Sequence, residues 1–156
     1  MVWLLIKDKL KTQDRLKPWD LVVGSDGNVG VCPLCKTEPD SRSHLFFACP
    51  YATQVWIKAA KLIDIPIVSA DWQVWVEHLI PFANRRVVRV VEAKLVIATY
   101  IYFIWQERNS RLFKTSSRTL DQLFQVIQST VRLKLLSVKF KDLSQVRRLK
   151  KLWSIS

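Results

Sequence analysis

The stretch Cys32-Pro-Leu-Cys35, followed by His44 and by Cys49-Pro50, decides how the chain folds, because it holds all three cysteines and one of the two histidines. Three thiolates and one imidazole form the ligand set of a closed, tetrahedral zinc site. The two-residue gap between Cys32 and Cys35 suits one tight turn that directs both sulfurs at one ion. The sequence therefore predicts a structural Zn²⁺ site. Its ligands are Cys32, Cys35, His44 and Cys49.

His44 and Cys49 could not both face the metal from one α-helix. Five residues turn through roughly 500°, which leaves the two side chains about 140° apart. The helix must therefore be interrupted between them, and Pro50 supplies a reason, since proline is favoured at the first position of a helix and disfavoured inside one. We expect a turn over residues 44–48, Cys49 at a helix entrance, and a helix from Pro50 towards Ile63.

Three other interpretations of the cysteines are open. Free cysteine is often a small, buried, inert hydrophobe, so the thiols could belong to the core without a metal. A disulfide would leave one thiol over, and the short apolar run of residues 1–6 does not resemble a secretory signal. A catalytic zinc is disfavoured, because no His-x-Glu or Cys-x-Glu triplet precedes Cys32 and four protein ligands leave no open position for water. The absence of cysteine elsewhere favours the structural zinc site.

Three further stretches carry recognisable sequence. The run His44-Leu-Phe-Phe-Ala-Cys49 is followed by Pro-Tyr-Ala-Thr-Gln-Val-Trp56, and before the first cysteine stand Trp3-Leu-Leu-Ile-Lys-Asp-Lys-Leu10 and Thr12-Gln-Asp-Arg-Leu16. Further along, Trp105 is followed by the pair Arg108-Asn109. Together with the first cysteine pair, these stretches resemble the zinc-binding region found downstream of the polymerase in plant non-LTR (LINE-type) reverse transcriptases. The resemblance implies a fragment of a retroelement polyprotein that carries the metal module without the catalytic parts. It therefore implies no enzyme activity.

Length and composition indicate a folded protein. The 156 residues suit one domain, or one domain with a small zinc lobe, and a hydrophobic fraction of 49% allows a real core. We expect a mainly α-helical fold in which a small CCHC zinc-binding lobe, with room for a short β-hairpin over residues 21–31, is followed by a helical bundle. The predicted division is residues 1–63 for the lobe and residues 64–156 for the helical segment with its basic C-terminal helix.

Apolar residues recur at helical spacing through most of the chain. Ser117 or Thr119 is the expected N-cap of the helix over 120–138. Residues 131–141 also alternate apolar and polar, so a strand is the open alternative there, although the Leu and Lys content favours a helix. The predicted helices cover residues 2–11, 50–63, 72–80, 84–113, 120–138 and 143–152.

Three expectations concern the helices over residues 72–80 and 84–113. Residues 95–105 are uncharged, but a membrane span needs about 20 such residues, so we expect a buried core helix. Arg108 and Asn109 are expected to close its exposed end. His78 is expected on a polar helix face rather than at the metal.

The whole net charge of +12 lies in the C-terminal half of the chain. Residues 1–81 hold nine Lys or Arg and nine Asp or Glu, whereas residues 82–156 hold sixteen against four, and 16 − 4 = 12. A polyanion should therefore bind the helical half rather than the zinc lobe, through phosphate contacts. The candidate nucleic-acid-binding residues are Arg132, Lys134, Lys139, Lys141, Arg147, Arg148, Lys150 and Lys151.

These observations predict a non-catalytic module that binds RNA or DNA weakly and without sequence preference. The alternative is a protein-interaction module with a purely structural zinc, in which residues 143–153 dock on a partner as an amphipathic helix. A third interpretation is that the basic residues form a solvated surface without a binding function. We expect no membrane partner, no small-molecule substrate, and an intracellular protein, the nucleus included. Among the tryptophans, Trp19 and Trp153 are the candidates for exposed base-stacking positions.

Overall fold

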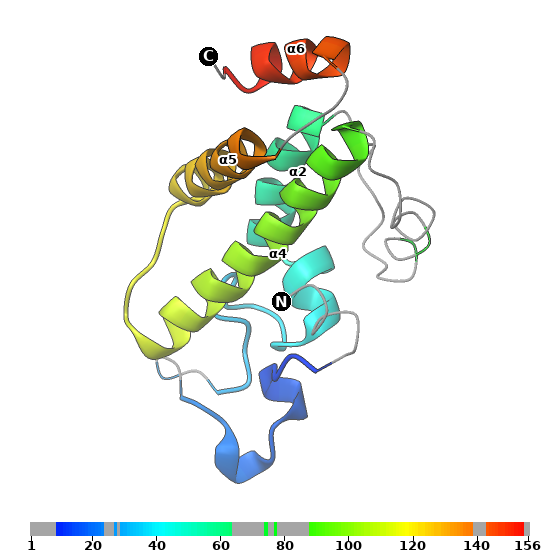
Figure 1. Ribbon diagram of the computed structural model, residues 1–156. Helices are drawn as coiled ribbons and strands as arrows, with labels where there is room; N and C mark the ends of the chain where they lie inside the picture. The colour runs from blue at the N-terminus through cyan, green and yellow to red at the C-terminus, as the bar shows by residue number, and fades with distance from the viewer. Residues whose placement is uncertain are drawn as a thin grey trace.

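The computed structural model describes residues 9–23, 27, 29–63, 74, 77, 88–138 and 143–154. Over these residues the protein is mainly helical, as the sequence predicts, and the segment with the three cysteines precedes the long helices (Figure 1). Two short 3₁₀ turns, η1 (Gln13–Arg15) and η2 (Pro18–Asp20), and one π-helical turn, η3 (His44–Ala48), lie in the N-terminal part. The longer helices are α2 (Pro50–Ile63), α4 (Val88–Phe113), α5 (Leu120–Ser137) and α6 (Leu143–Leu152).

Helices α2, α4 and α5 pack side by side, and α6 lies across one end of them (Figure 1). Their apolar stripes meet in a core to which the cysteine segment also contributes, so both predicted parts of the chain share buried contacts. Tyr100 of α4 connects the parts directly, because its hydroxyl donates hydrogen bonds to the carbonyls of Phe46, at 2.8 Å, and Ala52, at 3.2 Å. The division into residues 1–63 and 64–156 stays a prediction.

Helix α4 contains the uncharged stretch, and its residues Val96, Tyr100 and Ile104 are fully buried. In the part of the chain that the structure describes, no helix is long and apolar enough to span a membrane. The predicted start of this helix at residue 84 and the whole region around His78 lie outside the described residues, apart from Val74 and Glu77, which are helical.

The N-terminus of α5 is closed by a capping box, which confirms Thr119 as the cap. The Thr119 hydroxyl accepts a hydrogen bond from the Gln122 backbone, and the Gln122 side chain accepts one from the Thr119 backbone. The helix then continues to Ser137, so residues 131–137 are helical rather than extended. Residues 139–141, the rest of the ambiguous stretch, lie outside the described residues.

Among the described residues, which omit 24–26 and 28, the predicted β-hairpin is represented by one antiparallel bridge between Val23 and Val29. Gly27 and Gly30 both have positive φ, at +80° and +74°, which turns the chain sharply on either side of Val29. Val31 consequently pairs with Pro39 instead of extending the hairpin. Residues 9–12 are not helical, so the helix predicted over residues 2–11 does not reach its expected end, and residues 1–8 lie outside the described part.

A buried ion pair joins the cysteine segment to α4. The Arg108 guanidinium contacts both carboxylate oxygens of Asp40, and the two side chains are only 3% and 0% exposed. The expectation that Arg108 closes an exposed helix end is therefore wrong. Its partner lies 68 residues away in the sequence, and helical periodicity contains no signal for a contact of that range.

Asp40 also organises the segment before the first cysteine. Its carboxylate accepts a hydrogen bond from the Gln13 backbone at 2.9 Å, and its carbonyl accepts one from the Asp14 backbone at 3.2 Å. The Gln13 side chain in turn accepts a hydrogen bond from the Gly30 backbone at 3.2 Å. The Asp40 carboxylate thus joins turn η1 to α4, and the Gln13 side chain and the Asp40 backbone hold Gly30 beside them.

The position of Trp153 also differs from the prediction. Trp153 is 4% exposed, and its indole N–H donates a hydrogen bond to the carboxylate of Glu92, a buried residue of α4. Burial raises the pKa of Glu92, while the Trp153 hydrogen bond lowers it in part. Trp153 therefore anchors the end of α6 to the bundle and is not an exposed stacking residue.

Replacing Arg108 by methionine is expected to destabilise the fold by about 3–5 kcal/mol, because Asp40 would remain as an unpaired buried charge. Urea unfolding followed by circular dichroism measures this loss. Lys58→Met is the matched control, since Lys58 pairs with Asp121 at the surface and such pairs contribute less than about 1 kcal/mol. Equal, small losses for both variants would contradict the assigned role of Arg108.

Candidate metal centre

Cys32 and Cys35 lie at the two ends of a tight turn. The Lys36 backbone N–H donates to the Cys32 carbonyl at 2.8 Å, and the Cys32 N–H donates to the Glu38 carbonyl at 2.8 Å. Lys36 has a φ of 61°, a left-handed conformation that is unusual for a residue with a Cβ. The turn therefore reverses the chain directly after Cys35 and keeps both sulfurs on the same side, as the two-residue spacing predicts.

His44 and Cys49 meet through a π-helical turn. The Cys49 backbone N–H donates to the His44 carbonyl at 2.7 Å, which closes a ring over five residues instead of the four of an α-helix. This wider turn brings residues five positions apart onto one face. The predicted interruption is thus confirmed, and so is the predicted helix start, because α2 begins at Pro50 directly after Cys49.

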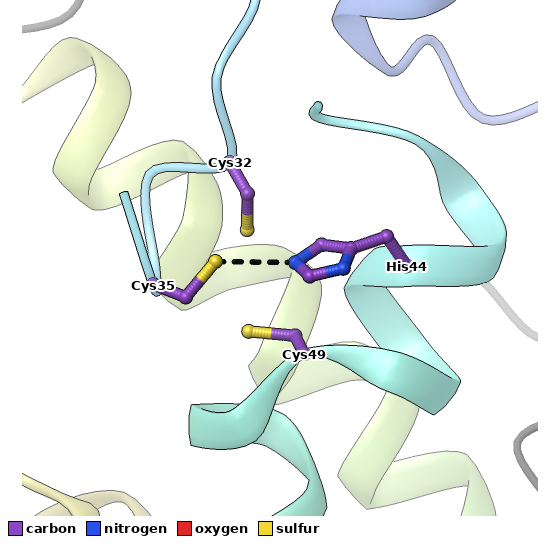
Figure 2. Close-up of side chains that lie close together, drawn as sticks. All are labelled: Cys32, Cys35, His44 and Cys49. Carbon is purple, nitrogen blue, oxygen red and sulfur yellow. Dashed lines mark hydrogen bonds between the residues drawn. The ribbon is translucent and has the colours of Figure 1, made fainter. Parts of the chain in front are cut away.

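The structure brings all four predicted ligands together. Their ligand atoms all lie within 4.8 Å of one another, and the Cys35 Sγ and His44 Nε2 atoms are 3.2 Å apart. Figure 2 shows the four side chains pointing toward one common point, Cys32 and Cys35 from the loop and His44 and Cys49 from either end of η3. Around a tetrahedral Zn²⁺ the same atoms would be about 3.5–3.8 Å apart. A contraction of about 1 Å at the widest pair therefore fits the donor set to zinc.

The cluster is buried on one side and partly exposed on the other. Cys32 and Cys49 are buried, whereas Cys35 and His44 are partly exposed. The Thr37 hydroxyl donates a hydrogen bond to the Cys35 sulfur at 3.3 Å, a contact of the kind that orients a metal-binding thiolate. Four protein ligands complete a tetrahedron, so the arrangement suits a structural ion and offers no open position for a catalytic water.

The pKa values of the two buried thiols are shifted in opposite directions. A hydrogen bond with Cys49, together with burial, raises the pKa of Cys32. The same bond lowers the pKa of Cys49, and the backbone N–H groups of Ala52 and Tyr51 at the start of α2 act in the same direction. The raised pKa of Cys32 means that this thiol must lose its proton when a metal binds.

Arg111 of α4 links this centre to the helices, and the sequence reasoning missed it. Its guanidinium donates to the Leu34 carbonyl, between the first two cysteines, at 3.2 Å, and to the Glu107 carboxylate at 2.9 Å. It also donates to the Arg118 carbonyl at 2.9 Å and lies over the Tyr51 ring, 4.4 Å from its centroid. The sequence signal that could have indicated this role is the group of charged residues within 107–111, which directly follows the uncharged stretch of the same helix.

Six of the eight predicted nucleic-acid-binding residues lie on α5 and α6, and none of the six belongs to the metal cluster. Lys139 and Lys141 lie outside the described residues. The other six are exposed: Arg132, Lys134, Arg147, Arg148, Lys150 and Lys151.

Residues 1–56 match the protein family described as zinc-binding in reverse transcriptase. The match covers all four clustered ligands and ends at Trp56, inside α2, so it covers neither α4 nor α5. It supports a zinc-binding region of retroelement reverse transcriptases in this part of the chain. No curated protein and no solved structure matches the chain significantly.

Removing the metal, or replacing Cys35 by serine, is expected to unfold the cysteine segment. Metal-binding free energy, about 10–16 kcal/mol for zinc-finger peptides, is folding free energy in such sites. Thermal unfolding with and without Zn²⁺ measures this: Zn²⁺ should raise the midpoint of the unsubstituted protein strongly and that of Cys35→Ser little. Thr37→Val is the control, because it removes one hydrogen bond to the sulfur and keeps all four ligands. Identical melting curves for zinc-loaded and chelated protein would contradict the assignment.

Zinc affinity is expected to fall as the pH falls, by about tenfold per pH unit for each thiol proton that the metal displaces. The raised pKa of Cys32 fixes the sign, since this thiol is protonated at neutral pH without metal and must release its proton on binding. Competition with a chelator of known proton affinity between about pH 6 and 8 measures the slope. An affinity independent of pH would show that these thiols do not bind the ion.

Proposed function

We propose that this chain is a non-catalytic module from a plant LINE-type retroelement reverse transcriptase, in which zinc stabilises the N-terminal lobe and the basic C-terminal half binds RNA or DNA without sequence preference. The family match supports the retroelement origin, and it concerns a zinc-binding region rather than a catalytic one. An intracellular and nuclear location follows from a nucleic-acid partner and belongs to the same proposal.

The nucleic-acid proposal rests on α6, which has one buried apolar side and one exposed basic side. Leu149 is buried in the helix, and Trp153, just after its end, is buried as well. The basic side chains on the same short stretch all remain exposed. These are Arg147, Arg148, Lys150 and Lys151. Leu149 and Trp153 therefore fix the helix to the molecule and leave four cationic side chains in solvent, an arrangement that suits contact with a phosphate backbone.

Helix α5 adds cations at the same end of the molecule. The Arg132 guanidinium donates to the Ser154 carbonyl at 2.7 Å, which places this part of α5 beside the end of α6, and Lys134 is exposed nearby in the sequence. By contrast, Arg108, Arg111 and Arg118 make hydrogen bonds inside the molecule, to Asp40 and Glu107 among others. These three charges are therefore unsuited to phosphate contacts.

The alternative function is a protein-interaction module that uses residues 143–153. A partner groove would have to cover the apolar side of α6, but Leu149 and Trp153 are already buried against this chain. Among the apolar side chains described on this helix, Leu152 is the one that is exposed, at 51%, and Val146 is partly buried. The alternative thus predicts a protein complex that tolerates salt and is lost in Leu152→Asp.

Lys150→Gln/Lys151→Gln is expected to weaken binding to duplex DNA and single-stranded RNA, and to reduce the log–log salt slope by roughly 1.4–1.8 units. Fluorescence anisotropy across a salt series measures both quantities. Lys61→Gln/Lys114→Gln is the matched control, since it removes the same charge from exposed positions on α2 and after α4. If both double variants change the slope equally, binding does not lie on α6.

A further inference from the structure

Trp19 lies in turn η2 with 76% of its surface exposed. Of the four tryptophans that the structure describes, Trp56 and Trp153 are buried and Trp105 is partly buried, so Trp19 differs from the rest. Tryptophan is usually well buried, because its large apolar surface is costly to expose. Two further observations concern this ring: the turn that carries it is held in place, and a cation lies over it.

The turn that carries Trp19 is held in place. Pro18 occupies its first position, and the Asp20 backbone N–H donates to the Lys17 carbonyl at 2.8 Å. The preceding turn η1 is fixed to Asp40 through Gln13, a buried residue. An aromatic ring on an anchored turn loses little conformational entropy when a ligand stacks on it.

A cation lies over the ring, and the chain segment that carries both residues is basic. The Lys17 ammonium lies over the indole, 5.1 Å from the ring centroid. Residues 9–20 carry four exposed cations and two exposed carboxylates, Asp14 and Asp20, which gives 4 − 2 = +2, whereas residues 1–81 are neutral as a whole. The four cations are Lys9, Lys11, Arg15 and Lys17. Exposed aromatic faces between cations are the composition of surfaces that bind single strands, where bases stack and phosphates pair with the charges.

We propose that Trp19, with Lys17 beside it, is a second nucleic-acid contact, which stacks an unpaired base of single-stranded RNA or DNA. This inference rests on the proposed nucleic-acid-binding function but concerns a different surface. Figure 1 places residues 9–20 at one end of the molecule and α6 at the other. The basic helices would then hold phosphates of either strand form, whereas Trp19 favours single strands, because a base inside a duplex has no free face.

The test uses the full zinc-loaded chain and three labelled probes of about twelve nucleotides, oligo-U, oligo-dT and a DNA duplex, at about 50 mM salt. Trp19→Ala is expected to weaken binding of the single strands roughly 5- to 150-fold, with duplex affinity unchanged. Trp19→Phe should restore most of the loss, because phenylalanine keeps a stacking face. Equal losses on oligo-U and oligo-dT indicate that the site does not distinguish RNA from DNA, and a loss on one alone identifies the preferred strand.

Tyr102→Ala is the control, since Tyr102 is 45% exposed on α4 and has no basic residue within four positions. It should leave all three affinities unchanged. Unaltered single-strand binding by Trp19→Ala, while the unsubstituted protein binds with a steep salt dependence, overturns the stacking site and leaves the basic helices as the binding surface. An equal loss on the duplex also overturns it. Failure of the unsubstituted protein to bind any probe overturns both proposals and points to a protein partner.

Discussion

The buried ion pair between Arg108 and Asp40 is the contact on which the arrangement of this molecule depends. Both side chains are removed from water, so neither charge could stay in place without the other. Asp40 at the same time fixes the backbone of turn η1, and Arg111, one turn further along α4, holds the loop between the first two cysteines. The metal-binding segment is therefore attached to the helices through charged groups at defined points as well as through apolar packing.

Zinc supplies what the N-terminal segment lacks in regular structure. Over its described residues this segment has two isolated β-bridges, three short 3₁₀ or π-helical turns and the turn between Cys32 and Cys35 before α2 begins. So few backbone hydrogen bonds would hold a small lobe poorly, whereas an ion bound by Cys32, Cys35, His44 and Cys49 closes its loops at one point. Because Leu34 contacts Arg111, ordering of the ion site also orders a surface against which α4 packs. Zinc therefore helps to order the helical half as well, although none of the four ligands comes from that half.

Local patterns were sufficient to predict the features that depend on near neighbours. The four ligands followed from their spacing, the interruption between His44 and Cys49 from helix geometry, and α2, α5 and α6 from apolar periodicity. The π turn itself was not foreseen, since the sequence indicated only that an α-helix would fail. Arg108 and Trp153 were placed wrongly at the surface, because their partners Asp40 and Glu92 lie 68 and 61 residues away. Among the described residues the hairpin is represented by one bridge, where two left-handed glycines redirect the chain around Val29.

The central claim is that the metal site and the helices fold as one cooperative unit, and unfolding of the Co²⁺-substituted protein in urea tests it most directly. Visible absorption reports the Co²⁺ coordination, and circular dichroism reports the helices. We predict that both signals change at the same urea concentration, as one transition requires. Loss of the coordination signal at clearly lower urea, with the helices intact, would contradict the claim and would show that Arg108 and Arg111 join two separately folding parts.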